Sequence, residues 1–240
     1  MMYLSYKQSA LSSWGGFKGR RRESDSPYIE SVWEGTAQRS GTHLTAADAT
    51  IDLAFQKKNG VTHLLLSGPT SKVQAAQFDA GDEVLAVRLR TGVYLPSMTG
   101  PGLADVNMIL PNANRGHFWL NYSSIAFPSF DNVETFTEYL AEKSILHRNL
   151  LLENVLQGRS LPGNIRTIQR HCLATTGLTM SRIRQIKRAE HARSLLTADY
   201  PLTRVAYEVG YSNSGHMANA FKHFFGYTPS TLRALMRQDR

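Results

Sequence analysis

Polar side chains that can recognise a nucleic-acid base gather on one side of the segment 213–222. Asparagine pairs with an adenine edge, serine with several base edges, and lysine with guanine or a phosphate. Two small residues on the same side allow a helix backbone to approach a ligand closely. The predicted contact residues are Asn213, Ser214, Gly215, Ala218, Asn219 and Lys222. Their types and spacing favour contact with DNA over the alternative, a merely solvated helix face.

Two helices and a tight turn are expected to hold this face. Gly210 supplies the turn, and Ser212 is expected to cap the second helix. Apolar residues recur in that helix at positions i, i+3, i+4, i+7 and i+8, namely Met217, Ala220, Phe221, Phe224 and Phe225. Gly226 is expected to end it, and Pro229 to open another short helix. This order is typical of a helix-turn-helix, whose second helix enters the DNA major groove.

The run AYEVGYSNSGHMANAFKHFFGYTPSTLR, residues 206–233, resembles the C-terminal signature of the AraC/XylS transcription regulators. The alternative, an unrelated amphipathic hairpin, would not require the turn glycine, the FK pair and the GYTP stop together. Members of that family often carry larger polar residues where this chain has Gly215 and Ala218. The resemblance implies sequence-specific binding to double-stranded DNA, contact with RNA polymerase, and activation more often than repression.

A weaker internal repeat lies upstream of this signature. With an offset of 49 residues, the segment 164–179 aligns with 213–228, so that Cys172 matches Phe221 and Gly177 matches Gly226. The segment is interpreted as a first recognition helix, with candidate DNA contacts at Asn164, Arg166, Thr167, Gln169 and Arg170. The preceding segment 158–164 is longer and more irregular than a standard turn. This first unit is therefore expected to dock chiefly through arginine, to phosphate or guanine.

The resemblance implies two helix-turn-helix units, at about 148–177 and 202–226, joined by a helix at about 180–197. Thr179 can cap the joining helix, whose apolar positions are Ile183, Ile186, Ala189, Ala192, Leu195 and Leu196. A helix of this length spans roughly 27 Å, and successive major-groove faces lie about 34 Å apart. The helix can therefore hold two recognition helices near one turn of DNA. An arginine-rich helix lying on a membrane is the weaker alternative, given its flanks.

The charge distribution agrees with a nucleic-acid partner. Residues 159–240 carry 13 Lys and Arg against 4 Asp and Glu, whereas residues 1–158 carry 14 against 15. The net charge of +8 on the 240-residue chain therefore lies in its C-terminal third. A basic module beside a neutral one is typical of a DNA-binding domain attached to something else.

The N-terminal half is expected to be rich in short strands. Two apolar runs, IDLAF and THLLLSG, flank the hairpin signal KKNG, and VLAVRLR follows as an alternating strand. The segment from TIDLAF to GVYLP also resembles the β-rich sensor domain of some AraC-type proteins, which implies binding of a small-molecule effector, self-association as a homodimer, or both. The predicted fold class is α+β. An antiparallel β barrel or sandwich-like domain (1–130) precedes an all-α DNA-binding domain with two helix-turn-helix units (131–240).

No residue pattern in the N-terminal half indicates catalysis, and no catalytic residue, cofactor or metal ligand set is predicted. His43, His63 and His117 lie far apart, whereas a metal site needs clustered ligands. Arg88 and Arg90 share a strand face that is either solvated or holds an anionic effector, and the run of arginines at 20–22 is interpreted as a solvated loop. The sequence shows neither a secretion signal nor eighteen consecutive apolar residues, so a cytoplasmic chain without membrane contact is expected.

Two other classes of function stay open. The first is a constitutive DNA-binding protein whose N-terminal domain is only structural or dimerising. The second is an enzyme within residues 1–130 fused to a DNA-binding module. DNA-alkylation repair proteins that share this helical module use reactive cysteines, and the single cysteine here, Cys172, falls on the expected core face with Ile165 and Ile168. That placement argues against the enzyme.

Overall fold

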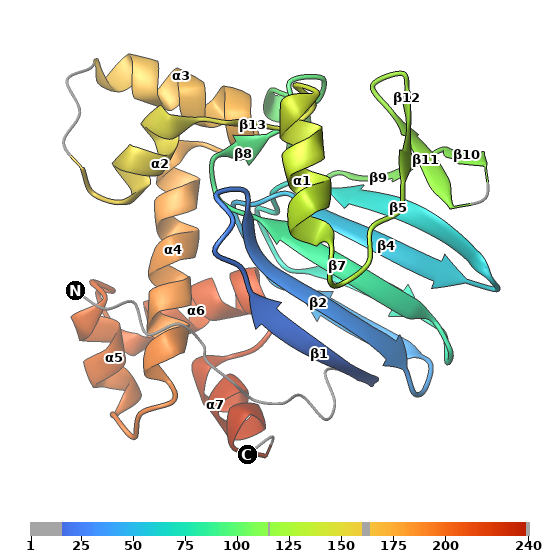
Figure 1. Cartoon of the computed structure of the whole chain (residues 1–240). Helices are drawn as coiled ribbons and strands as arrows, with labels where there is room; N and C mark the ends of the chain where they lie inside the picture. The colour runs from blue at the N-terminus through green and yellow to red at the C-terminus, as the bar shows by residue number, and fades with distance from the viewer. Residues whose placement is uncertain (1–15, 115, 160–163, 239–240) are drawn as a thin grey trace.

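The computed structural model describes residues 16–114, 116–159 and 164–238. A β-rich N-terminal part is followed by a helical C-terminal part, which confirms the predicted α+β class. Figure 1 shows the sheet on one side and the helices of the C-terminal part stacked beside it. Among the helices in the described ranges, none has the length and apolarity that a membrane crossing requires.

A six-stranded antiparallel sheet forms the centre of the N-terminal part. Its hydrogen-bonded order is β1 (Phe17–Glu23), β2 (Ile29–Ala37), β7 (Glu83–Leu89), β4 (Asp52–Lys58), β5 (Val61–Ser67) and β9 (Asn107–Leu110). The KKNG hairpin is confirmed, because Lys58 pairs with Val61 and leaves Asn59 and Gly60 as a two-residue turn. Both turn residues have positive φ, at 50° and 78°, as the tight turn between twisted strands requires.

Three smaller sheets complete the described β-structure. They are β3 (Gly41–Thr45) with β6 (Gln74–Phe78), β8 (Val93–Tyr94) with β13 (His147–Arg148), and β10 (Asn112–Asn114), β11 (His117–Leu120) and β12 (Ser123–Ala126) together. A short 3-10 helix, η1, spans Pro101–Leu103. β1 and β9 end the order of the large sheet, so this sheet is open, not closed into a barrel.

Helix α1 (Val133–Glu142) belongs to the core of the N-terminal part, against which it lies in Figure 1. The Phe136 ring lies edge-on to Phe55 at 5.7 Å, and Val133 and Leu140 are buried in the same apolar cluster. That cluster continues to Leu146. The expected boundary at residue 130 therefore falls inside this core and separates α1 from the sheet that covers it.

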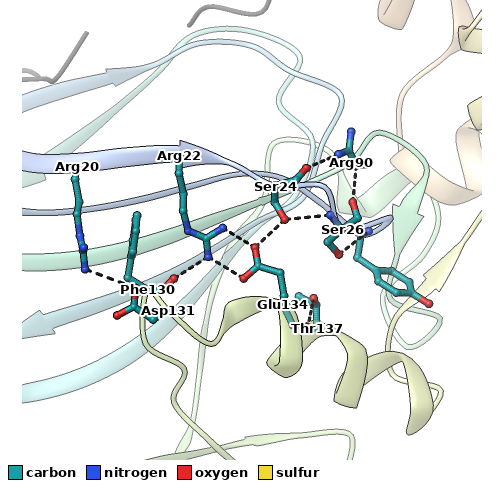
Figure 2. A network of polar contacts seen from close by, with 10 residues as sticks. Arg20, Arg22, Ser24, Ser26, Arg90, Phe130, Asp131, Glu134 and Thr137 are labelled. Carbon is teal, nitrogen blue, oxygen red and sulfur yellow. Dashed lines mark hydrogen bonds and ion pairs between the residues drawn. The ribbon is translucent and has the colours of Figure 1, made fainter. Parts of the chain in front are cut away.

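Figure 2 shows the polar contacts that fix α1 to the first strand. Arg22 donates to both carboxylate oxygens of Glu134, at 2.6 and 2.8 Å, and to the backbone oxygen of Phe130 at 2.8 Å. The hydroxyl of Ser24 donates to the same carboxylate at 2.7 Å. The hydrogen bond from Arg22 lowers the pKa of Glu134 to about 2. The arginine run at 20–22 is therefore part of β1 and not a solvated loop, because all three residues pair with β2 and Arg22 also reaches a helix more than 100 residues away.

Six helices make up the C-terminal part as far as the structure describes it. They are α2 (Leu150–Leu156), α3 (Ile165–Thr176), α4 (Met180–Leu195), α5 (Leu202–Glu208), α6 (Ser214–Phe225) and α7 (Pro229–Gln238). Their buried cluster centres on α4 and α6, with Ile183, Met217 and Phe221 fully buried. Two residues of the N-terminal part, Ala47 and Ala49, are buried in this same cluster. The two parts therefore share apolar contacts as well as a chain connection.

The core face predicted for α3 is confirmed at two positions and wrong at a third. Cys172 is fully buried, and Ile168 packs against the helical cluster. Ile165 is 66% exposed, because it stands at the first position of the helix, where the chain has not yet reached the cluster. Burial raises the pKa of the Cys172 thiol, which disfavours the reactive thiolate.

Candidate nucleic-acid interface

The second predicted helix-turn-helix unit is formed by α5, a tight turn and α6. Gly210 adopts the left-handed conformation at φ 79°, and Tyr211 donates its backbone N–H to Ala206 at 2.8 Å. Arg188 of α4 holds this turn, since it donates to the Gly210 oxygen at 3.2 Å and its guanidinium lies 4.4 Å from the Tyr211 ring centre. The turn is thus fixed from outside the unit.

Asn213, and not Ser212, caps the N-terminus of α6. The side-chain oxygen of Asn213 accepts from the backbone N–H of His216 at 2.7 Å. The Ser212 hydroxyl lies instead 3.1 Å from Nδ1 of His216. The sequence allowed either cap, because both residues are preferred at that position. The cap uses one of the two lone pairs of the Asn213 oxygen and fixes the direction of its side chain, so a two-bond pairing with adenine would have to share this oxygen with the cap.

The other residues predicted on this helix lie on its accessible side. Gly215, Asn219 and Lys222 are exposed, and Ser214 and Ala218 are half-buried. The opposite side is buried through Met217, Phe221, Phe224 and Phe225. The structure therefore brings the predicted contact residues together on one face that is open to a ligand.

The first unit is formed by α2 and α3. The side chain of Asn164 caps α3 by accepting from the backbone N–H of Arg166 at 2.9 Å. Arg166, Gln169 and Arg170 are exposed, and Thr167 is half-buried. Part of the irregular turn between the two helices, residues 160–163, lies outside the described residues. The exposed side of α3 is more basic than that of α6, with two arginines against one lysine.

The internal repeat is matched by the geometry of the two helices. Each has 12 residues and begins after an asparagine cap, at Asn164 and at Asn213, which are 49 positions apart. Each ends at a left-handed glycine, with φ 68° at Gly177 and 80° at Gly226. α3 is therefore built as a second copy of α6, although few of their side chains agree.

Helix α4 connects the two units as predicted, and the Thr179 hydroxyl caps it by accepting from the Arg182 N–H at 3.2 Å. Its 16 residues span about 24 Å. Most of its basic side chains serve internal contacts. The Lys187 ammonium lies 3.0 Å from Glu190, and the Arg182 guanidinium lies 3.4 Å from the His223 ring nitrogen. The lysine and arginine side chains of α4 therefore add less positive charge to the protein surface than the sequence indicates.

Sequence reasoning missed two further exposed side chains of the second unit. His216 lies in the first turn of α6, with its ring edge-on to Tyr211 at 5.3 Å. Arg204 of α5 places its guanidinium 4.3 Å from the Tyr200 ring. His216 could have been found from its place in the quoted signature, whereas nothing in the sequence singles out Arg204.

Neither of the two uses expected for Arg88 and Arg90 is observed. Arg88 forms ion pairs with Asp52 at 2.8 Å and with Asp48 at 2.9 Å. Arg90 donates to the backbone oxygens of Ser24 and Ser26. Both guanidinium groups are therefore engaged in internal contacts, and both side chains are half-buried. Asp48 is 5% exposed, and burial raises its pKa to about 7 although Arg88 opposes the shift.

Among the described residues, the side chains that could ligate a metal are scattered, and one hollow is lined by polar turns. Within them, three or more His, Cys, Asp or Glu side chains nowhere gather in a way that could bind a metal. A hollow of about 300 Å³ lies between the β4–β5 and β6–β7 turns. Its wall contains Lys58, which is already paired with Asp82 at 2.9 Å. The hollow is thus a polar gap between two turns.

Comparison with known proteins supports the interpretation of the helical part. Residues 159–235 match a protein family described as a helix-turn-helix domain. The chain is 39% identical over 67 residues to the HTH-type transcriptional regulator RipA of Corynebacterium diphtheriae, covering 28% of this chain and 20% of RipA. It is 34% identical over 71 residues to the HTH-type transcriptional activator RhaS of Salmonella arizonae, covering 29% of this chain and 26% of RhaS.

Over most of its length the chain also aligns with a solved structure. This is ToxT from Vibrio cholerae with a bound unsaturated fatty acid, at 11% identity and a TM-score of 0.44, covering 89% of this chain and 97% of ToxT. The sequence matches span only a fifth to a quarter of the length of RipA and RhaS. The family match falls on the capped, turn-linked helices described above, and residues 159–235 are thus a helix-turn-helix domain, similar in sequence to parts of these two transcriptional regulators.

Proposed function

We propose that this chain is a sequence-specific regulator of transcription that reads two successive major-groove segments of double-stranded DNA, one with α3 and one with α6. The observation that carries the proposal is the equivalence of the two helices. Both begin at an exposed asparagine cap, and both have one buried and one accessible side. Two such helices joined by α4 fit a pair of grooves better than a single site.

The residues of α6 and α3 would divide the work of recognition. Asn219 and Lys222 stand beyond the cap of α6 on its exposed side, so we assign them base contacts. We assign Arg166 and Arg170 of α3 to guanine or phosphate, and Thr167 and Gln169 to neighbouring edges. Asn164, Asn213 and Ser214 hold the helix starts near the groove, and Gly215 and Ala218 allow close approach.

We further propose that the chain is divided at residues 147–148 into an N-terminal and a DNA-binding domain. The apolar cluster of the sheet ends at Leu146, and that of the helices begins at Leu152 apart from Ala47 and Ala49. The N-terminal domain would bind a small-molecule effector or pair two copies as a homodimer. Activation through contact with RNA polymerase is the proposed outcome, because RhaS, which this chain resembles, is named an activator.

A constitutive regulator with a purely structural N-terminal domain is the second candidate. The engagement of Arg88 and Arg90 in internal contacts favours it, since these were the side chains best suited to an anionic effector. A thermal shift of the full chain against a small-molecule library distinguishes the two candidates, because an effector stabilises the folded state by mass action.

The test of DNA recognition begins with selection of duplexes from a random-sequence pool by the full chain. Lys222→Ala should then weaken binding to the selected duplex, whereas Lys18→Ala, which removes an equal charge from an exposed position on β1, should not. A lost base contact costs about 1–3 kcal/mol. Equal affinities of the two variants, or failure of the wild type to enrich any duplex, would contradict the proposed function.

A further inference from the structure

The N-terminal domain donates backbone hydrogen bonds to both recognition helices at equivalent positions near their C-terminal ends. Gly100 donates its backbone N–H to the Ala174 oxygen of α3 at 2.9 Å, and Val73 donates to the His223 oxygen of α6 at 3.0 Å. Ala174 and His223 are 49 residues apart, the same offset that relates the two helices. A third bond joins the Ala47 N–H to the Phe224 oxygen at 2.8 Å.

These bonds satisfy groups that a helix cannot satisfy by itself. The last four carbonyls of a helix have no partner within it. In each recognition helix, the glycine at the end supplies one N–H, from Gly177 to Leu173 and from Gly226 to Lys222. The next carbonyl along the chain accepts from the N-terminal domain. The N-terminal domain therefore supplies partners for carbonyls at both helix ends.

Close backbone packing accompanies the hydrogen bonds. A Cβ atom added at Gly177 would lie 2.7 Å from the backbone nitrogen of Ala104, and one added at Gly226 would lie 3.0 Å from Leu44. Both end glycines thus face the N-terminal domain, Gly177 against backbone atoms and Gly226 against the side chains of Leu44 and Val73. The domain touches α3 through the segment around η1, and α6 through β3, Val73 and the segment that follows β3.

The segment that follows β3 is itself held firmly in the N-terminal domain. Asp48 and Thr70 exchange backbone hydrogen bonds at 3.1 Å, and the Thr70 hydroxyl donates to the Ala46 oxygen at 3.2 Å. The Asp48 carboxylate is paired with Arg88 on β7. Ala47 and Ala49, on either side of Asp48, are buried among the helices. A displacement of this segment would therefore move the end of α6 with it.

The opposite ends of the two helices remain accessible. Both caps, Asn164 and Asn213, are exposed. The predicted contact residues that follow them are exposed or half-buried. Figure 1 shows α3 and α6 on the same side of the sheet, near opposite ends of α4. Each helix is thus anchored at its C-terminal end and presents its N-terminal half.

We propose that the N-terminal domain is a splint that fixes the spacing and orientation of α3 and α6, and that Ala104 and Thr70 are positioning residues for DNA recognition. The proposal rests on the proposed function. Without the splint, the two helices would be related through α4 alone. The property that the splint confers is selectivity for the number of base pairs between the two groove segments, beyond affinity for either one.

The first test is amide hydrogen exchange of the full chain, without DNA and with a duplex selected from a random pool. The amides of Gly100, Val73 and Ala47 should exchange slowly in both states, because their hydrogen bonds persist when the helices read DNA. Fast exchange in the absence of DNA would show that the bonds are not stable. Protection that disappears on DNA binding would show that these hydrogen bonds are broken when the helices bind DNA. Either result would overturn the proposal.

The second test compares spacing selectivity among matched variants. Ala104→Leu places a larger side chain against the Gly177 backbone, whereas Val106→Leu introduces the same side chain at an exposed position two residues away. Thr70→Val removes the hydroxyl that ties the segment after β3, with little change in shape. Affinity is measured for the selected duplex and for versions with two base pairs inserted between the protected segments.

The wild type and Val106→Leu should prefer the original spacing by about tenfold or more, the loss expected when one groove segment no longer fits. Ala104→Leu and Thr70→Val should show a smaller preference, with unchanged affinity for random DNA. A role in stability alone would lower affinity for both spacings equally, and undiminished preference in both variants would refute the splint. If the wild type enriches no duplex at all, the proposed function fails, and the exchange data from DNA-free protein still report whether the hydrogen bonds to the helix ends exist.

Discussion

The Asn213 side chain is both the cap of α6 and a predicted contact for a DNA base. Its oxygen closes the first turn of α6 by accepting from the His216 N–H, and the same oxygen would be needed to pair with adenine. The cap exists before DNA arrives, so α6 already holds this side chain when it meets a base. Asn164 is in the same position on α3. The base-reading role expected from residue type alone therefore falls more heavily on Asn219 and Lys222, which carry no cap.

Replacing Asn213 by alanine should lower the free energy of unfolding by about 1 kcal/mol, because the cap is lost. Asn213→Ser should retain most of that stability, since serine also caps. Asn219→Ala should leave stability within about 0.5 kcal/mol of the wild type while weakening specific DNA binding. Chemical denaturation and DNA titration of the three variants check this. Equal stability of Asn213→Ala and Asn213→Ser would show that the cap contributes nothing.

Asp48 predicts a dependence of stability on pH. Burial raises its pKa to about 7, against the attraction of Arg88 and with repulsion from Asp52 and Glu190. Because the folded pKa lies above the ordinary value of an aspartate, this group stabilises the folded state most at pH below about 4. That contribution is lost as the pH rises through 7.

Asp48→Asn, which cannot ionise, should therefore show a smaller loss of stability between pH 5 and pH 8 than the wild type. Denaturation of both proteins at several pH values measures the difference. Asp79→Asn is the control, as Asp79 lies on an exposed turn. Identical pH profiles of Asp48→Asn and the wild type would mean that Asp48 keeps an ordinary pKa in the folded protein.

At the scale of elements, three glycines share a left-handed backbone conformation but differ in how closely other atoms pack against them. Gly210 has open space where a Cβ would lie, Gly226 would meet the end of the Leu44 side chain, and Gly177 would meet the backbone of Ala104. All three have φ between 68° and 80°. The strain of an alanine in this conformation, about 1–2 kcal/mol, is common to the series.

Alanine substitutions should therefore destabilise in the order Gly210, Gly226, Gly177, from least to most. Leu44 can move aside, whereas the Ala104 backbone is fixed by η1. Thermal unfolding of the three variants measures the order. If Gly177→Ala were no worse than Gly210→Ala, the contact between the end of α3 and the N-terminal domain would not exist in solution.

The elements that the sequence predicted well are those with local signals. The KKNG turn, the Thr179 cap and the left-handed Gly226 each depend on residues within a few positions of one another. The placement of α1 could not be predicted in this way, because Glu134 finds its partner at Arg22. Arg20 to Arg22 likewise carry no apolar alternation that would have identified β1. Contacts between distant segments leave little trace in local pattern.

For the whole molecule, the shared contact at Ala47 and Ala49 changes what a separated domain can do. No periodicity marks these two small residues, yet both are buried among the helices. The sequence predicted a helical domain that begins at residue 131. In the structure, the apolar face of α1 is covered by the sheet, and the ends of both recognition helices are completed by the N-terminal domain.

A fragment of residues 147–240 should fold, with a lower melting temperature than the full chain, because the ends of α3 and α6 lose their donors. A fragment of residues 131–240 should aggregate, since Val133, Phe136 and Leu140 are then exposed. Circular dichroism and size-exclusion chromatography distinguish the two. If the longer fragment were as monodisperse as the shorter one, α1 would not depend on the sheet.

The central claim is that one chain reads two groove segments with two equivalent helices. A hydroxyl-radical footprint of the full chain on a duplex selected from random DNA tests it most directly. We predict two protected segments on one face of the duplex, about 10 base pairs apart from centre to centre, with Arg166→Ala and Arg170→Ala together weakening one and Asn219→Ala the other. A single protected segment that is insensitive to the two α3 arginines would contradict the claim.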